Sequence, residues 1–203
     1  MDRITRREQQ IAHAKIMFSH HKAVFRQLDG ISTLDWRKED GSSDYYVRYV
    51  FDEERCCLYL SGDLGSAVVR LTERATLQAL SGYINMVDYF VEKIECSTDK
   101  YYYDEEIAQE ELEEILFPED VTLSDEEKEE RQDCLEELME QFTGFDGFRT
   151  VSDDSHCLLS EICPDYGELL CKAGRYMATR IILWLVGLQM AWEQVKKEVA
   201  AND

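Results

Sequence analysis

The sequence lacks the features that would assign it to a membrane or secreted class. Its longest uninterrupted apolar run, IILWLVGL at residues 181–188, is only eight residues long, far short of the roughly twenty residues that cross a bilayer. The N-terminus begins with charged and polar residues instead of an apolar leader. We therefore expect no membrane anchor, a cytoplasmic location and reduced thiols.

Motifs for metal and nucleotide binding are also lacking. The seven cysteines form an odd set without a CxxC pair. Cys157, Cys163 and Cys171 follow His156 at separations wider than zinc modules use, so we expect buried structural cysteines and no metal. The glycines of SGDLGSA (61–67) lie between expected strands and match neither GxGxxG nor a Walker pattern, which favours a turn. No cofactor is predicted.

No recognisable catalytic motif is present either. His20 and His21 have no nucleophile or carboxylate paired with them by spacing, which favours surface or boundary positions. Asp63 and Asp88 are carboxylates of the type that metal-dependent nucleases use, but no motif selects them among 43 acidic residues. The sequence thus assigns no catalytic residue.

Positive charge is scarce: 43 acidic and 22 basic residues give a net charge of −21. Residues 95–140 contain 20 acidic and three basic residues and account for −17 of this charge, whereas the first 38 residues are basic. Such a chain repels nucleic acid and anionic membranes and is attracted to basic surfaces. We therefore expect a basic protein as partner, with no membrane and no direct binding of duplex DNA.

The hydrophobic pattern predicts an α+β fold. Residues 4–28, 73–95 and 174–198 have helical periodicity, and 181–188 is apolar all round, as expected for a buried helix. The segments 45–51 and 56–62 read as a β-hairpin, with a third strand ending near Leu71. The expected architecture is one domain, 1–203, in which a small antiparallel β-meander packs on helices and 96–148 forms a peripheral acidic helical insertion.

Two segments of this insertion predict acidic amphipathic helices. In DEEKEERQDCLEELMEQF (125–142), Ser124 and Glu127 form a capping box, and Lys128 and Arg131 fall on the apolar side with Leu135 and Leu138. The carboxylates expected to face outward are Glu126, Glu129, Glu130, Asp133, Glu137 and Glu140. In 105–116 the corresponding residues are Glu106, Glu110, Glu113 and Glu114. Together they predict a partner-binding surface.

Three consecutive tyrosines precede the acidic helices. Tyr101, Tyr102 and Tyr103 cannot all point inward, so we expect at least one to be exposed beside the acidic surface. There it would suit an arginine-rich partner through cation–π contact. The alternative interpretation is that these tyrosines pack the edge of the domain.

A short, acidic, leaderless α+β protein with carboxylate-rich helices resembles anti-CRISPR proteins, which phages and mobile elements encode against host defence. The stretch DWRKEDGSSDYYVRYVFDEERCCLYLSGDLGSAVV (35–69) is similar to hypothetical proteins of phages and mobile elements of Gram-positive bacteria. The resemblance implies action in a bacterial host cell on a CRISPR effector nuclease, with or without guide RNA. Anti-CRISPR proteins share no diagnostic signature, so no residue role follows from it.

Two hypotheses follow. In the first, the chain is an inhibitor that occupies a basic DNA- or RNA-binding groove of a CRISPR effector as an acidic mimic of nucleic acid. In the second, it is an enzyme, a metal-dependent nuclease or modifier, that acts on the effector or its guide RNA near Asp63 or the His20–His21 pair. The basic first helix could additionally contact RNA.

Overall fold

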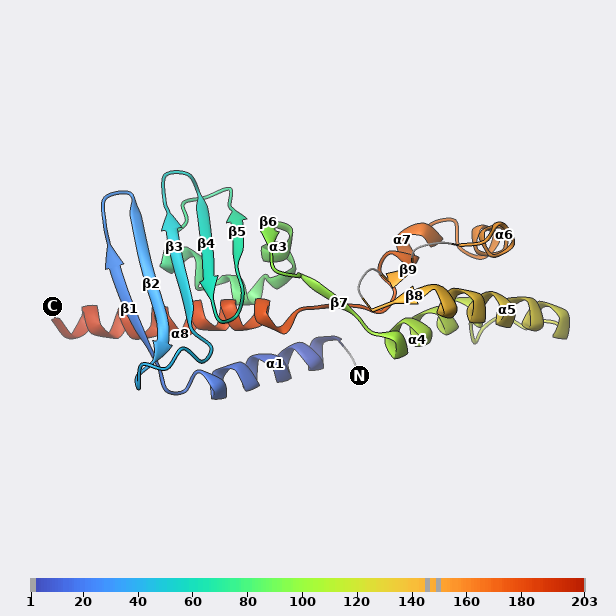
Figure 1. The fold of residues 1–203 in the computed structure, drawn as a ribbon, viewed down its shortest axis with the longest axis horizontal. Coiled ribbons are helices and arrows are strands. Elements are labelled where there is room, and N and C mark those ends of the chain that lie inside the picture. The colour runs from blue at the N-terminus through green and yellow to red at the C-terminus, as the bar shows by residue number, and fades with distance from the viewer. Residues whose placement is uncertain (1–2, 145–146, 149–150, 203) are drawn as a thin grey trace. The chain divides into compact units, whose positions relative to one another are not determined.

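The computed structural model describes residues 3–144, 147–148 and 151–202 (Figure 1). The chain divides into two compact units. The first, which we call the sheet unit, comprises Met1–Lys100 and Ala178–Asp203; the second, the acidic unit, comprises Tyr101–Met177. The fold is α+β, as predicted from the sequence.

A six-stranded antiparallel sheet forms the sheet unit, and its strand order follows the chain, so that each strand pairs with the next. The predicted hairpin and third strand are confirmed, but the meander is larger than expected. The strands are β1 (His21–Gln27), β2 (Ile31–Lys38), β3 (Val47–Asp52), β4 (Cys57–Gly62), β5 (Ala67–Arg70) and β6 (Ile94–Ser97).

The helix predicted over 4–28 is wrong in its second half. Helix α1 (Arg3–Met17) ends before the turn that leads into β1. In β1 the alternation of buried His21 and Ala23 with exposed Lys22 fits a strand, and β1 pairs with β2 along its full length. Leu28, at the end of the predicted helix, is 64% exposed in the β1–β2 turn.

The predicted helix over 73–95 is interrupted. It is replaced by α2 (Leu77–Leu80), the 3₁₀ turn η1 (Tyr83–Asn85) and α3 (Val87–Glu92), after which the chain enters β6. The apolar residues that suggested a helix are nevertheless buried: Leu77, Leu80, Ile84, Val87 and Val91. The periodicity therefore identified the side facing the core correctly but not the length of the helix.

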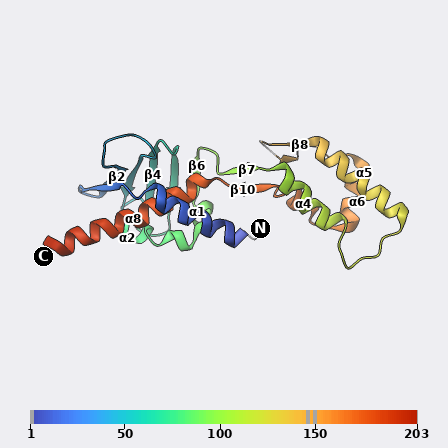
Figure 2. The ribbon, with the colours of Figure 1, turned by 90° about the horizontal axis from the view of Figure 1, so that it is seen from below.

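Helix α8 (Thr179–Asn202) is the central helix of the sheet unit and lies with α1 and α2 on one face of the sheet (Figures 1 and 2). Residues 181–188 are buried, as predicted. Trp184 and Leu185 of α8 are fully buried, as are Trp36 and Tyr49 of the sheet. The Tyr49 hydroxyl donates a hydrogen bond to the carbonyl oxygen of Trp184 at 2.8 Å, which ties the helix to β3.

The acidic unit consists of short helices around a separate small core. Its helices are α4 (Glu105–Leu116), α5 (Asp125–Gln141), α6 (Asp153–Ile162) and α7 (Tyr166–Leu170). Strand β7 (Tyr101–Tyr103) pairs with β10 (Arg175–Met177), and β8 (Phe142–Thr143) pairs with β9 (Gly147–Phe148). The core residues are Leu112, Leu116, Cys134, Leu135, Leu138, Leu159, Leu170 and Ala173.

The acidic unit differs in its limits from the predicted insertion. The sequence predicts an insertion over 96–148, but Cys96 lies in β6 of the sheet, and the compact unit extends through α6 and α7 to Met177. Helices α6 and α7 belong to it because Leu159 and Leu170 complete its core.

Within the described ranges, no helix has the length and apolar character needed to cross a membrane.

Candidate partner-binding surface

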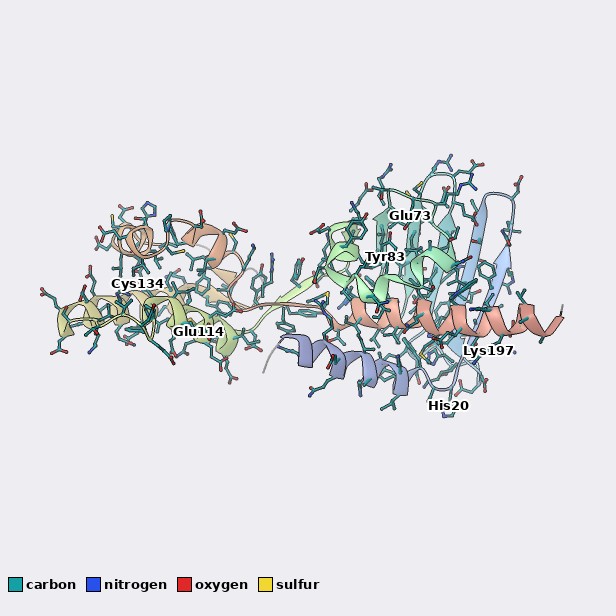
Figure 3. The ribbon with its side chains drawn as sticks, turned by 180° about the vertical axis from the view of Figure 1, so that it is seen from behind. His20, Glu73, Tyr83, Glu114, Cys134 and Lys197 are labelled. Carbon is teal, nitrogen blue, oxygen red and sulfur yellow. The ribbon has the colours of Figure 1, made fainter. Side chains whose placement is uncertain are left out.

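Helix α4 presents one apolar side and one acidic side, as its periodicity predicts. The Asp104 side chain caps the helix by accepting a hydrogen bond from the Ile107 backbone N–H at 3.2 Å. Ala108, Leu112 and Leu116 are buried, and the two leucines belong to the core of the acidic unit. The four carboxylates predicted to face outward, Glu106, Glu110, Glu113 and Glu114, are all exposed (Figure 3 labels Glu114).

Helix α5 begins at the predicted capping box. The Ser124 backbone N–H donates to the Glu127 carboxylate at 2.7 Å, and the Glu127 N–H donates to the Ser124 hydroxyl oxygen at 3.2 Å. The hydrogen bond from the Ser124 backbone lowers the pKa of Glu127, so Glu127 stays charged at the positive end of the helix. Of the six carboxylates predicted to face outward, five are exposed: Glu126, Glu129, Glu130, Asp133 and Glu140.

The sixth carboxylate, Glu137, was predicted to face outward, and this prediction is wrong. Its carboxylate is half-buried and accepts hydrogen bonds from the Ser152 hydroxyl at 2.7 Å, the Ser155 hydroxyl at 2.6 Å and the Ser152 backbone N–H at 3.1 Å. Ser152 is the N-cap of α6, so Glu137 joins α5 to the start of α6. The hydrogen bonds from Ser155 and Ser152 lower the pKa of Glu137. The periodicity of α5 alone could not predict this contact, because the contact depends on where α6 packs.

Cys134, labelled in Figure 3, lies about one helical turn before Glu137 in α5 and is buried. Burial raises the pKa of its thiol, so the thiol stays protonated and unreactive at neutral pH. The burial expected for this cysteine is confirmed. The expectation of buried cysteines is wrong for Cys96, Cys157 and Cys171, whose side chains are exposed.

The described cations of the acidic unit interact locally. Arg131 donates to the Leu116 carbonyl oxygen at 2.7 Å, which satisfies the C-terminal end of α4. Lys172 pairs with Glu168, and the Arg175 guanidinium lies 4.3 Å from the centre of the Tyr101 ring. Lys128 lies 3.8 Å from Asp125, and it is exposed, although the sequence places it on the apolar side.

The two units differ strongly in charge. Residues 101–177 contain 24 acidic and five basic residues, a net charge of −19, whereas the sheet unit contains 19 acidic and 17 basic residues, a net charge of −2. Nearly the whole excess of negative charge therefore belongs to the acidic unit. Much of it is carried by the exposed sides of α4 and α5.

The three tyrosines form strand β7 and are all half-buried. Tyr101 lies under Arg175, Tyr102 packs against Tyr176 with ring centres 5.8 Å apart, and Tyr103 closely approaches Gly147. Each ring thus packs within the acidic unit, as the alternative interpretation of the sequence proposed. The cation–π contact expected for a partner's arginine is made by Arg175 of the same chain.

Asp63 and Asp88, two carboxylates considered for the enzyme hypothesis, each make a local contact. Asp63 accepts a hydrogen bond from the Tyr45 backbone N–H at 2.8 Å, which holds a loop in which Tyr45 has a positive φ of 57°. Asp88 pairs with Arg7 at 2.8 Å. His20 is exposed (Figure 3), whereas His21 is buried against Phe18. Over the part of the chain that the structure describes, His, Cys, Asp and Glu side chains form no cluster able to hold a metal ion.

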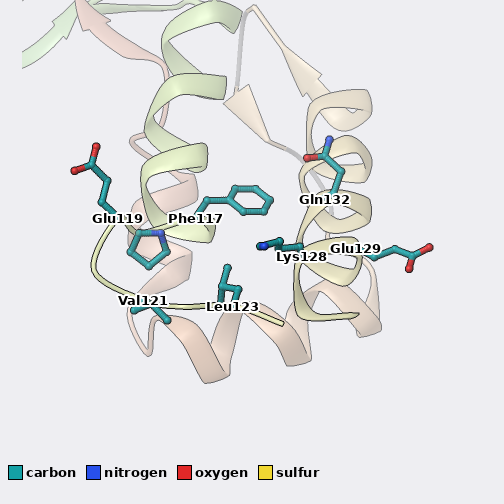
Figure 4. Close-up of a pocket in the computed structure, with 8 residues that line it drawn as sticks. Phe117, Glu119, Val121, Leu123, Lys128, Glu129 and Gln132 are labelled. Atoms are coloured by element: carbon teal, nitrogen blue, oxygen red, sulfur yellow. The ribbon is translucent and has the colours of Figure 1, made fainter. Parts of the chain in front are cut away.

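A feature that the sequence analysis missed lies between α4 and α5. The linker 117–124 and the start of α5 surround a surface hollow of about 590 Å³, whose lining includes Phe117, Pro118, Val121 and Leu123 (Figure 4). The apolar residues of this linker are the sequence feature that could have indicated the hollow. They lie close together between two strongly acidic segments.

No protein-family model matches the sequence, and no curated protein or solved structure matches the chain. Its function must therefore be inferred from its own residues and their arrangement.

Proposed function

We propose that the acidic unit binds a basic surface of another protein, one that normally binds the phosphate backbone of nucleic acid, and thereby competes with nucleic acid. The observation that carries this proposal is the exposed row of carboxylates on α4 and α5. Eight carboxylates of α5 and five of α4 are exposed, and the described cations of this unit are engaged locally. Like charges this close on a helix cost stability, so the arrangement favours a role outside the fold.

The spacing of charge supports nucleic-acid mimicry. Helix α5 has 17 residues, which corresponds to about 26 Å at 1.5 Å per residue, and eight of its carboxylates are exposed. The resulting density, about one charge per 3 Å, is close to that of one DNA strand, about one per 3.4 Å. A groove that binds phosphates would therefore meet a similar field and release similar counterions.

A CRISPR effector nuclease is the specific partner we propose, because such nucleases have basic channels for guide RNA and target DNA and because the chain resembles anti-CRISPR proteins. The inhibitor acts by occupancy, near one to one. An enzymatic mechanism has less support, because Asp63 and Asp88 are engaged in structural contacts and His21 is buried.

The test is a pulldown of a CRISPR effector, with and without guide RNA, followed by affinity measurements at increasing salt. The binding variant reverses five of the eight exposed α5 carboxylates, Glu126, Glu129, Glu130, Asp133 and Glu140, to Lys. The control reverses five exposed carboxylates of the sheet unit, Glu39, Glu54, Glu92, Asp99 and Glu193, and so changes the net charge equally.

We expect the first variant to lose binding and inhibition and the control to retain most of both. Wild-type affinity should fall steeply with salt, because exposed charges are screened beyond about 8 Å at physiological ionic strength. Equal loss in the two variants would indicate non-specific attraction, and salt-independent binding would exclude the mechanism.

A further inference from the structure

The α4–α5 hollow combines an apolar part with an acidic part. Its apolar part is lined by Phe117, Val121 and Leu123, with Lys128 and Glu129 of α5 beside them (Figure 4). A second hollow of about 690 Å³ adjoins it and shares Phe117, Glu119 and Gln132 with it. The second hollow is also lined by the α4 carboxylates Glu110, Glu113 and Glu114.

The apolar side chains of the hollow are accessible to a partner. Val121 is 49% exposed, and Leu123 and Phe117 are half-buried. Phe117 also packs against the core of the acidic unit, and this packing holds its ring in place at the hollow. Val121 and Leu123 lie in the linker beyond the end of α4, and neither belongs to the core cluster.

The charges around the hollow define what can occupy it. Five exposed carboxylates line the two hollows: Glu110, Glu113, Glu114, Glu119 and Glu129. Lys128 is the one cation among the described lining residues, and it lies near Asp125. Nucleic acid and a second copy of this chain, itself at −21, are repelled. A basic polypeptide that presents an apolar side chain is complementary to both parts.

We propose that the hollow binds an apolar side chain, such as leucine, of the basic protein, with lysine or arginine residues beside it meeting Glu110, Glu113 and Glu114. This inference rests on the proposed function and extends it. The carboxylates of α4 and α5 attract any basic surface, and the hollow selects a polypeptide that carries an apolar anchor among its cations. Buried anchors of this kind supply much of the affinity of protein interfaces.

Two synthetic peptides test the proposal against the full-length chain. Both contain the same number of lysines and arginines; one has two leucines at positions i and i+4, and the other has serines there. Affinities are measured by fluorescence anisotropy. The protein variant is Val121→Ser with Leu123→Ser, accompanied by Val121→Ser alone. The matched control is Val199→Ser, because Val199 is similarly exposed at 57% but lies on α8.

We expect the leucine peptide to bind the wild-type chain roughly tenfold more tightly than the serine peptide, because burial of one apolar side chain contributes about that factor. The double variant should lose this preference while binding the serine peptide with unchanged affinity, which also shows that it is folded. The single variant should lose part of the preference, and Val199→Ser none.

Equal binding of both peptides to the wild-type chain, still weakened by salt, would overturn the anchor and leave the proposed function standing. A preference that survives in the double variant would place the anchor elsewhere and overturn the assignment of the hollow. If neither peptide binds at low salt, both the anchor and the attraction to basic polypeptides are wrong.

Discussion

At the scale of single residues, Glu137 shows that membership of an acidic helix does not define a carboxylate's role. It accepts three hydrogen bonds from Ser152 and Ser155, whereas Glu140, one turn later, is exposed. Hydrogen bonds to a charged group contribute more than neutral ones. Glu137 therefore stabilises the packing of α6 on α5, and reversing its charge would disturb the fold together with the surface.

We predict that Glu137→Gln lowers the free energy of unfolding by about 1–3 kcal/mol, because the charge-assisted hydrogen bonds are weakened. Glu140→Gln, the matched control, should change stability little. Because the pKa of Glu137 is lowered from 4.5, its contribution is present above that pH and is lost as the pH falls through the pKa of the folded state. Urea unfolding at neutral and acidic pH measures both effects.

His21 gives a second pH dependence. It is 2% exposed between Phe18 and Trp36, and burial lowers its pKa below 6.5, with a smaller contribution from Lys38 and a partial offset from the Asp44 backbone. The unfolded chain therefore binds a proton more readily than the folded chain. Stability from the neutral ring is present above about pH 6.5 and is lost as the pH falls toward the lower pKa of the folded state.

We predict that the free energy of unfolding of the wild-type chain decreases between pH 7.5 and pH 5.5, and that His21→Phe removes most of this decrease. Phenylalanine retains the aromatic contacts but cannot titrate. His20→Ala is the control, because His20 is exposed. Urea unfolding at each pH is the measurement, and an identical pH dependence in wild type and His21→Phe would contradict the prediction.

At the scale of elements, α8 approaches the sheet closely at Gly187. A Cβ atom there would lie 2.6 Å from the Tyr49 hydroxyl oxygen and 3.2 Å from Cδ1 of Trp36. The Tyr49 hydroxyl donates to Trp184 on the same helix, so the helix, β3 and β2 meet at this point. The absence of a side chain at Gly187 thus permits the contact between α8 and the sheet.

We predict that Gly187→Ala destabilises the protein by about 1–3 kcal/mol, because overpacking and displacement of Tyr49 outweigh the better helix propensity of alanine. Gly167→Ala in α7 is the control, since a Cβ there meets nothing within 4 Å; it should be neutral or slightly stabilising. Thermal unfolding compares the two. A stabilised Gly187→Ala variant would show that α8 can shift away from the sheet at little cost.

At the scale of the whole molecule, the charge is divided between a nearly neutral sheet unit and an acidic unit of −19. Exposed like charges repel one another within the acidic unit and attract a basic partner by the same field. Salt should therefore act oppositely on the free protein and on the proposed complex with a basic partner. It relieves the repulsion in the first and weakens the attraction in the second.

We predict that the melting temperature of the free protein rises as sodium chloride increases from about 0.01 M, where the Debye length is about 30 Å, to 0.15 M, where it is about 8 Å. The variant with five of the exposed α5 carboxylates reversed should show a smaller rise, because its acidic unit carries less net charge. A salt response equal in both proteins would show that repulsion within this unit does not limit stability.

The sequence by itself determined the features that depend on local chemistry. The capping box at Ser124 needs only two residues three positions apart. Residues 181–188 are buried because their side chains are apolar on every side of the helix. Strand β3 follows from its β-branched and aromatic residues, Val47, Tyr49, Val50 and Phe51. The exposed carboxylates of α4 were predictable because one side of that helix packs on a core and the other faces solvent.

Tertiary structure alone decided the remaining features. The helical pattern predicted over residues 4–28 does not show that residues 21–27 pair with β2, a segment further along the chain. Glu137 accepts a hydrogen bond from Ser155 only because α6 packs against the same side of α5. The α4–α5 hollow likewise exists only after a linker folds between two helices. Such features depend on which distant segments meet, and a periodic pattern within one segment cannot contain that information.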